Sequence, residues 1–262
     1  MAKNPRTAGG FTILELMIAM GIFLVICGAM FGLLELSQKR YSSESQLSGS
    51  FQEARLGVDQ ILRDVNVSGY PSKNLFSNPL NSNSYAVSPF AWEPGYNGAN
   101  SNNPCQVTLT CNPTPAKFDL IVETDINGTV SWIRYQLKNT TLYRSVVAKS
   151  SINPVSATSA AAVMTPFVEN VMNNVGEPLL GDIRAQNPAM FSNGPVPIFQ
   201  YTCDTPSGPQ PCDRVAAPYN APQNISDIDV TLLVKTPDVD IETGTIQLLE
   251  LSGRGHRSNR AN

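Results

Sequence analysis

The chain contains 262 residues, of which 42% are hydrophobic and 15% charged, and its 18 basic and 21 acidic side chains give a net charge of −3. This acidic balance argues against a nucleic-acid-binding protein, which normally presents a basic face, so we expect no nucleic-acid partner. His256 is the single histidine, which excludes metal sites with several histidines and most histidine-based catalytic triads.

The N-terminus combines a short basic segment with a long apolar one. Residues 1–10 are polar and carry Lys3 and Arg6, and the 24 residues of 11–34 contain a single charge, Glu15. At about 1.5 Å per residue, this run is about 36 Å long as a helix, enough to cross a hydrocarbon core of about 30 Å. The basic residues before it favour a cytoplasmic N-terminus, which places the rest of the chain outside the cytoplasm.

Two other kinds of segment share some of these features. A secretory signal peptide has a shorter apolar region, followed by a small-x-small cleavage site, whereas here the small pair Gly9-Gly10 precedes the run. An uncleaved membrane anchor is the second alternative, and it does not require Glu15. A carboxylate inside an apolar run is costly, so Glu15 indicates a functional site.

The segment Gly10-Phe11-Thr12-Ile13-Leu14-Glu15-Leu16 resembles the processing site of type IV prepilins and pseudopilins. The resemblance implies that a prepilin peptidase cuts after Gly10 and N-methylates Phe11, and that Glu15 acts in assembly. It implies a single-pass protein of the bacterial inner membrane that later enters a pilus or pseudopilus. The implied partners are the prepilin peptidase, other major and minor pilins or pseudopilins, the inner-membrane assembly platform and membrane lipid.

The absence of proline from residues 11–70 permits one unbroken helix over 11–66. We expect a leader at 1–10, a helix at 11–66 with 11–34 transmembrane, and a globular, β-rich periplasmic or extracellular head at 67–262. The second half of the helix has apolar residues at spacings of three and four, typical of an amphipathic helix: Leu47, Phe51, Ala54, Val58, Ile61 and Val65.

The head is predicted from turns and alternating patterns. Residues 71–116 lack periodicity and predict a long surface excursion held by aromatic residues and a disulfide. Residues 117–147 predict a three-stranded meander with a hairpin turn at Asn127-Gly128. Thr165-Pro166 indicates a short helix to Met172, and further strands are expected at 196–201, 228–234 and 245–251. The fold class is α+β, with the long helix packed on a mostly antiparallel sheet.

Several segments resemble PilW-type minor pilins, and the J-type pseudopilin of type II secretion shares their layout. These segments are Ala54-Arg55, Arg63-Asp64, Ser68-Gly69-Tyr70, Trp132-Ile133-Arg134-Tyr135 and Leu142-Tyr143-Arg144. The resemblance implies a structural subunit that primes assembly, or sits at the tip, of a type IV pilus or type II secretion pseudopilus. The alternatives are a major pilus or DNA-uptake subunit, or a membrane-anchored periplasmic enzyme. We find no catalytic motif and therefore expect no enzyme.

Four cysteines follow the apolar run and would lie on the oxidising side of the membrane, where disulfides are the default. Local pairs, Cys105 with Cys111 and Cys203 with Cys212, are favoured over cross-pairing, although the sequence does not fix connectivity. A zinc site is the alternative, but the close thiol pairs of zinc ribbons are missing. We expect no metal and no cofactor.

Two charged segments remain near the C-terminus. Asp238, Asp240, Glu242 and Gly244 lack the spacing of a calcium-binding EF-hand, so we interpret them as a solvated turn, with a calcium-binding loop as the alternative. Arg254, His256, Arg257 and Arg260 form a basic tail that we expect to be disordered, with contact to an acidic partner as the alternative.

Overall fold

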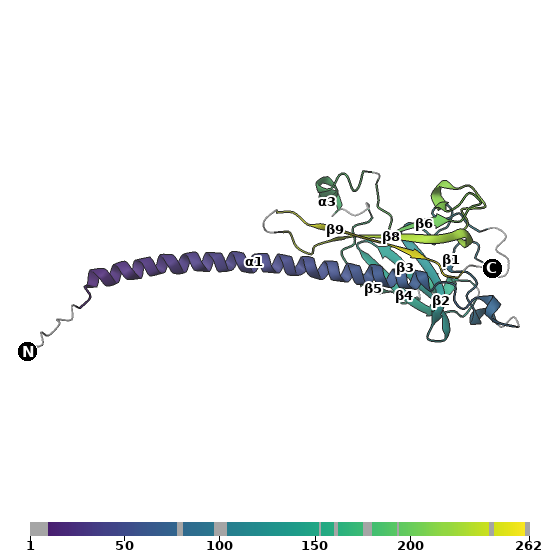
Figure 1. The fold of residues 1–262 in the computed structure, drawn as a ribbon, viewed down its shortest axis with the longest axis horizontal. Helices are drawn as coiled ribbons and strands as arrows, with labels where there is room; N and C mark the ends of the chain where they lie inside the picture. The colour runs from purple at the N-terminus through teal and green to yellow at the C-terminus, as the bar shows by residue number, and fades with distance from the viewer. Residues whose placement is uncertain are drawn as a thin grey trace, which may run out of the picture.

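The computed structural model describes residues 10–77, 81–96, 104–151, 153–159, 162–174, 180–192, 194–240 and 244–259. One long helix, α1, projects from a β-rich head (Figure 1). The helices and strands are α1 (Ile13–Asn66), β1 (Phe90–Ala91), β2 (Asp119–Ile126), β3 (Thr129–Lys138), β4 (Thr141–Ala148), α2 (Val155–Thr158), β5 (Thr165–Val168), α3 (Leu180–Gln186), β6 (Phe199–Cys203), β7 (Gln210–Pro211), β8 (Ile225–Lys235) and β9 (Leu248–His256).

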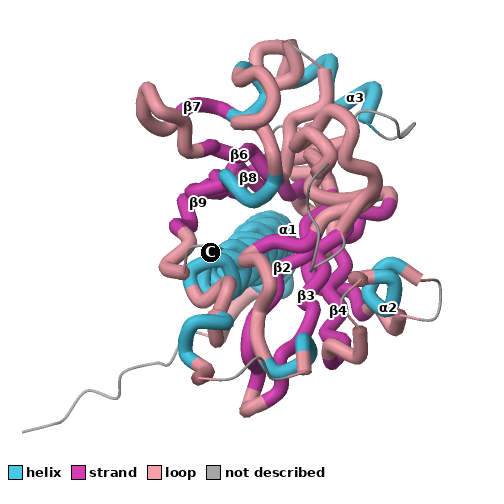
Figure 2. The backbone as a smooth tube through the Cα atoms, turned by 90° about the vertical axis from the view of Figure 1, so that its right-hand side faces the viewer, coloured by secondary structure: helices cyan, strands magenta, loops and turns pink. Residues whose placement is uncertain are grey.

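The strands form two antiparallel sheets rather than one. The first has the order β1-β2-β3-β4-β5 and the second β7-β6-β8-β9. Figure 2 shows β6, β8 and β9 on one side of α1, and β2, β3 and β4 on the other. The α+β class with antiparallel strands is confirmed, and the last turns of α1 pack between the two sheets.

The buried face of α1 begins later than the sequence pattern predicts. Ala54, Val58, Ile61 and Val65 are buried in a core shared with both sheets, whereas Phe51 is 41% exposed. The buried part of the helix is therefore limited to its last turns. Its earlier turns lie outside the head (Figure 1).

Glycines bring β9 close to α1. A Cβ added at Gly253 would lie 2.5 Å from Cδ1 of Leu62, and one at Gly255 would lie 2.7 Å from Cγ1 of Val65. Glycine in a strand commonly marks such a close approach of another segment. Residue numbers rise together along the two elements, so β9 runs parallel to α1.

The meander follows the predicted turn chemistry. Residue Asp119 pairs with Gln136 at one end of β2 and β3. Asn127 and Gly128, between these strands, have φ values of 54° and 86°. Positive φ at both central residues is the requirement of a type I′ hairpin turn.

Two predictions of local structure are wrong. The segment from Thr165 forms β5, not a helix, because Pro166 lies on an edge strand where its missing N–H removes no bond needed by a central strand. The basic tail is not disordered: Arg254 and His256 lie in β9, and the buried Arg257 donates a 2.7 Å hydrogen bond to the Gln223 carbonyl. Arg260 lies outside the described residues.

The described part of 71–116 covers one face of the first sheet. Trp92 and Tyr96 are buried, and the Tyr96 ring packs edge-on against Trp92 and Trp132, with centroids 4.4 and 5.6 Å away. Cys105 and Cys111 belong to the same hydrophobic cluster. The predicted anchoring by aromatic residues and a disulfide is therefore present in the described part of this segment, whereas residues 71–77 and 81–85 are exposed or partly buried.

Candidate functional site

The N-terminus of α1 is closed by a reciprocal pair of hydrogen bonds. Thr12 is the N-cap, and its Oγ1 accepts a 3.3 Å bond from the Glu15 backbone N–H. The Glu15 Oε2 accepts a 2.9 Å bond from the Thr12 backbone N–H and a 3.1 Å bond from the Thr12 hydroxyl. This capping box satisfies two of the donors that a helix start leaves unpaired. It fixes the Glu15 carboxylate at the beginning of the helix, where the helix dipole favours an anion.

Gly10 and Phe11 precede this cap and are accessible. The Phe11 side chain is 92% exposed, and Gly10 has no other heavy atom near the position of a Cβ. Both residues lie next to Glu15 at the far end of α1 from the head (Figure 1). The structure therefore brings the three predicted processing and assembly residues together.

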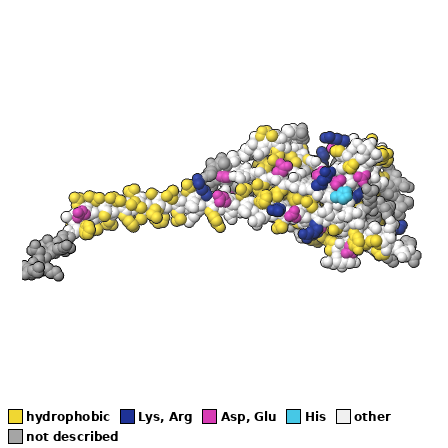
Figure 3. All heavy atoms as spheres, viewed as in Figure 1, with side chains coloured by type: hydrophobic (Ala, Val, Ile, Leu, Met, Phe, Trp, Pro, Cys, Tyr) yellow, Lys and Arg dark blue, Asp and Glu magenta, His cyan; other side chains and the backbone are white. Residues whose placement is uncertain are grey.

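The helix that follows has an unpartnered apolar surface. Within the described chain, α1 is the one helix long and apolar enough to cross a membrane. Figure 3 shows hydrophobic side chains along the projecting part of α1, whereas on this side of the head hydrophobic side chains are interspersed with charged and other groups. The exposed apolar side chains include Ile13, Leu14, Leu16, Met17, Ile18, Met20, Ile22, Phe23, Leu24, Val25, Ile26, Met30, Phe31, Leu33 and Leu34.

The other end of α1 is fixed to the first sheet by a polar triad of Asp64, Tyr135 and Arg144. The Tyr135 hydroxyl donates to Asp64 Oδ2 at 2.5 Å, and Arg144 donates to the same oxygen at 2.9 Å and to the Tyr135 hydroxyl at 3.0 Å. Burial, followed by the Asp64 charge, raises the pKa of Tyr135. Tyr135 therefore stays a neutral donor, and the triad sets the position of the helix on the head.

Two further ion pairs lie inside the head. Arg134 donates to Asp119 through Nε at 3.0 Å and Nη2 at 2.5 Å. Lys149 pairs with Glu123 where neither side chain is exposed, and the Tyr96 hydroxyl donates to Glu123 at 2.7 Å. Burial raises the pKa of Asp119 and of Glu123, and their cationic partners oppose the shift. Buried pairs of this kind are costly to break, which suits a structural role.

The four head cysteines form two local disulfides. Cys105 bonds to Cys111, and Cys203 bonds to Cys212. Each bridge closes a short loop beside the sheets. Cys27 is a free thiol within the apolar part of α1.

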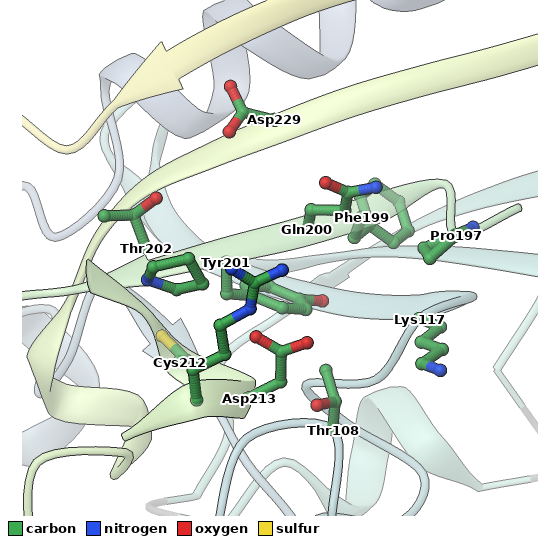
Figure 4. A pocket seen from close by; sticks show the side chains of 12 residues that line it. Thr108, Lys117, Pro197, Phe199, Gln200, Tyr201, Thr202, Cys212, Asp213 and Asp229 are labelled. Carbon is green, nitrogen blue, oxygen red and sulfur yellow. The ribbon is translucent and has the colours of Figure 1, made fainter.

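A pocket of about 290 Å³ lies beside β6 and the second disulfide. Its lining includes Tyr201, Cys212, Lys117, Asp213 and Asp229. Figure 4 shows Asp229 apart from Lys117 and Asp213, on the other side of β6. Lys117, Asp213 and Asp229 therefore do not converge on one point in this pocket.

The segment predicted as a solvated turn contacts the helix. Asp238 accepts a 2.9 Å hydrogen bond from the Gln46 side chain, and the Asp240 carboxylate accepts a bond from Gln247. Glu242 lies outside the described residues. No group of three His, Cys, Asp or Glu residues placed to hold a metal occurs in the part of the chain that the structure describes.

Thr12 and the polar triad make contacts at the two ends of α1 that sequence reasoning missed. Thr12 was detectable, because Thr-x-x-Glu before an apolar run is the sequence pattern of a capping box. Asp64, Tyr135 and Arg144 stand in segments that carry the family resemblance, but their contact depends on the packing of α1 against the sheet.

The comparison with known proteins gives one match, at the N-terminus. Residues 5–36 match the family model described as the prokaryotic N-terminal methylation motif. No curated protein and no solved structure matches the chain significantly. The matched segment contains Gly10, Phe11, the Thr12–Glu15 cap and most of the exposed apolar helix. This motif, on a helix able to anchor the chain in a membrane, supports a type IV prepilin-like protein.

Proposed function

We propose that the chain is a minor pilin or pseudopilin, a structural subunit that primes assembly or sits at the tip of a type IV pilus or type II secretion pseudopilus. The observation that carries this proposal is the division of α1 into two parts. Its apolar first part is exposed from Ile13 onward, and its last turns are buried between two sheets. Such a helix can lie first in lipid and later among other helices, while the head stays folded.

In this proposal the leader 1–10 is removed by a prepilin peptidase and Phe11 is N-methylated. The exposure of Gly10 and Phe11 supports their access to an enzyme. The N-terminus lies on the cytoplasmic side of the inner membrane before processing, and the head lies in the periplasm. The Thr12–Glu15 cap sits directly beyond the proposed cleavage point.

Glu15 is proposed to set the position of the subunit in the fibre. Cleavage would free the α-amine of Phe11, and the amine of a neighbouring subunit could approach the Glu15 carboxylate. In an apolar surrounding such an attraction is much stronger than in water. An unpaired carboxylate is costly there, so one axial position of the helices would be favoured over others.

The head favours a minor over a major subunit. It contains two sheets and two disulfide-closed loops, and a bulky head packs poorly along a repeating fibre. A PilW-type or J-type identity is part of this proposal and rests on the resemblance of the segments that include Asp64, Tyr135 and Arg144. The same proposal implies that other pilins and the inner-membrane assembly platform are partners of this chain.

The experiment that tests the proposal is cleavage of Gly10→Val in the native host. We expect the precursor to remain uncut, because a bulky side chain should not fit the peptidase at this position. Gly10→Ala is the matched control and should be processed at least in part. The measurement is the intact mass of the membrane-extracted protein, which gives both the N-terminal residue and its methylation. A Gly10→Val protein that still begins at methylated Phe11 would contradict the proposal.

A further inference from the structure

The second sheet ends in a long strand whose outer edge has free backbone groups. β9 is the edge strand of the order β7-β6-β8-β9. Beyond its ends, the Arg257 N–H bonds to the Ser226 carbonyl at 3.0 Å and the Thr236 N–H bonds to the Gln247 carbonyl at 2.9 Å. Backbone bonds in an antiparallel pair alternate along the strand, so the odd-numbered residues of β9 bond to β8. The N–H and C=O groups of its even-numbered residues therefore point away from the sheet.

These outward groups are mostly unpaired. His256 N–H is used, because it donates to the Asn66 side chain at 2.9 Å. Within the described residues, the backbone N–H groups of Glu250, Ser252 and Arg254 have no partner. Figure 2 shows no drawn element beyond the outer side of β9. The strand thus resembles the exposed sheet edges to which extended segments of other chains add.

The side chains along this edge suit a second strand. Glu250, Ser252 and Arg254 are exposed on one face, whereas Gly253 and the partly buried Leu251 face α1. No proline interrupts β9. An added strand would extend the sheet beside α1 without displacing any element of the head.

The charge of the exposed face defines the partner. Arg254 already lies 3.4 Å from Asp229 and 3.7 Å from Asp227, so its charge is balanced within the chain. Glu250 is exposed and in no ion pair among the described residues, so its carboxylate is available to a cation of another chain. We propose that the outer edge of β9 binds an extended segment of a different chain, paired antiparallel and carrying a basic residue opposite Glu250.

A second copy of this chain does not fit the edge in that pairing. β9 runs parallel to α1, as Gly253 lies beside Leu62 and Gly255 beside Val65. Antiparallel pairing of two β9 strands would reverse one helix relative to the other and put their apolar parts at opposite ends. Two subunits anchored in one membrane cannot meet in this way, a step that rests on the proposed function. Antiparallel pairs are also slightly more stable per residue than parallel ones.

The test uses the full-length protein in detergent and a labelled probe peptide, acetyl-Thr-Val-Thr-Val-Lys-Val-Thr-amide, whose Lys would face Glu250. Ser252→Pro removes an outward N–H and no bond to β8, so the head should stay folded while peptide affinity falls at least about tenfold. Ser252→Thr is the matched control and should bind as the wild type does. Hydrogen exchange should show protection of residues 250, 252 and 254 when the peptide binds.

Charge exchange gives a second, independent readout. Glu250→Lys should prefer the peptide in which Glu replaces Lys, and the wild type should prefer the Lys peptide, each by about twofold to fivefold. No binding of the Lys peptide to the wild type, or equal binding to Ser252→Pro, would overturn the proposal. Concentration-dependent dimers of the wild type that Ser252→Pro abolishes would also overturn it, because the edge would then serve self-association.

In the native host, Ser252→Pro should be cleaved after Gly10 as the wild type is, yet be lost from sheared fibres. Normal incorporation of this variant would contradict the β9 proposal and leave the proposed function intact. A wild-type protein that is never cut after Gly10 would instead contradict the proposed function.

Discussion

Lys149 and Glu123 show how single residues hold the head together. Both side chains are fully buried, and Glu123 also accepts bonds from the Tyr96 hydroxyl and, at 3.2 Å, from the Val87 backbone N–H. Lys149 further donates a 3.0 Å bond to the Tyr85 carbonyl and lies 5.3 Å from the Trp132 ring centroid. The pair therefore joins β2 to the end of β4 and to the long segment that precedes β2.

We predict that Lys149→Met destabilises the head by about 3–5 kcal/mol, because Glu123 is left as a buried charge without its cation. The double variant Glu123→Gln/Lys149→Met removes both charges and should recover much of this loss. The measurement is urea unfolding of the full chain in detergent, followed by the fluorescence of the buried Trp92 and Trp132. Equal stability of the single and double variants would contradict the argument.

The same variant should respond to pH in a defined direction. Burial already raises the pKa of Glu123, and Lys149 opposes that shift. A carboxyl group whose pKa is raised in the folded state costs stability when it is ionised, and the cost disappears as the pH falls below the folded pKa. Removing Lys149 raises the folded pKa further. The stability gap between Lys149→Met and the wild type should therefore narrow as the pH is lowered from 8 to about 5.

At the scale of elements, two of the glycines of α1, Gly49 and Gly57, differ in their surroundings. Gly57 faces the head, where a Cβ would lie 2.5 Å from Cγ2 of Val168, whereas Gly49 has nothing within 4 Å. Val168 is buried and β-branched, so its methyl group has little freedom to move. The contact between α1 and β5 therefore depends on the absence of a side chain at residue 57.

We predict opposite effects for the same substitution at these two positions. Gly57→Ala should destabilise the head by about 1–3 kcal/mol through overpacking. Gly49→Ala should stabilise the helix by about 0.5–1 kcal/mol, because alanine is the better helix former. The measurement is urea unfolding. Tryptophan fluorescence reports the unfolding of the head, and far-UV circular dichroism reports the loss of the helix. A Gly57→Ala protein as stable as the wild type would show that α1 is not packed against Val168.

Elements with strong local signals could be predicted from the sequence, and those defined by packing could not. The proline-free run and its spacing predict α1, and Asn127-Gly128 predicts the first hairpin. β5 was predicted as a helix because Pro166 suits a helix start as well as an edge strand. β9 was missed beyond residue 251 because the positions that face α1 there, Gly253 and Gly255, carry no apolar side chains. The division into two sheets has no local signal at all.

At the scale of the whole molecule, the two ends of α1 have different kinds of contact. The N-terminal end rests on its own cap, in which the side chains of Thr12 and Glu15 bond only to these two residues among the described residues. The C-terminal end is held by groups from both sheets: Thr124 donates to the Val67 carbonyl at 2.8 Å, and His256 donates to Asn66. The head therefore fixes the helix direction and leaves the apolar end free for other chains.

The difference between the two ends of α1 also explains which part of the candidate site can be predicted from the sequence. Gly10, Phe11 and Glu15 lie within a continuous segment, so a local motif is sufficient to find them. The Asp64–Tyr135–Arg144 triad joins positions more than 70 residues apart, such as Asp64 and Tyr135, and only the packed structure brings them together. The free edge of β9 is likewise a property of sheet order and not of composition.

Two substitutions separate the proposed role of Glu15 in fibre assembly from its role in the helix cap. Glu15→Ala removes both the charge and the bonds to Thr12, whereas Glu15→Gln removes the charge but can still bond to the Thr12 N–H. We expect both variants to be inserted and cut after Gly10, and both to fall at least about tenfold in sheared fibres. The measurements are intact mass for cleavage and quantitative proteomics of sheared fibres for incorporation.

The comparison of the two variants decides what Glu15 does. If the carboxylate attracts the amine of a neighbouring subunit, an uncharged amide cannot replace it, and Gln fails as Ala does. If Glu15 serves only to begin the helix, Gln should enter fibres at the wild-type level while Ala does not. Normal incorporation of Glu15→Gln would therefore contradict the assembly mechanism without affecting the processing site. Loss of membrane insertion in both variants would instead point to a simple anchoring role for this end of α1.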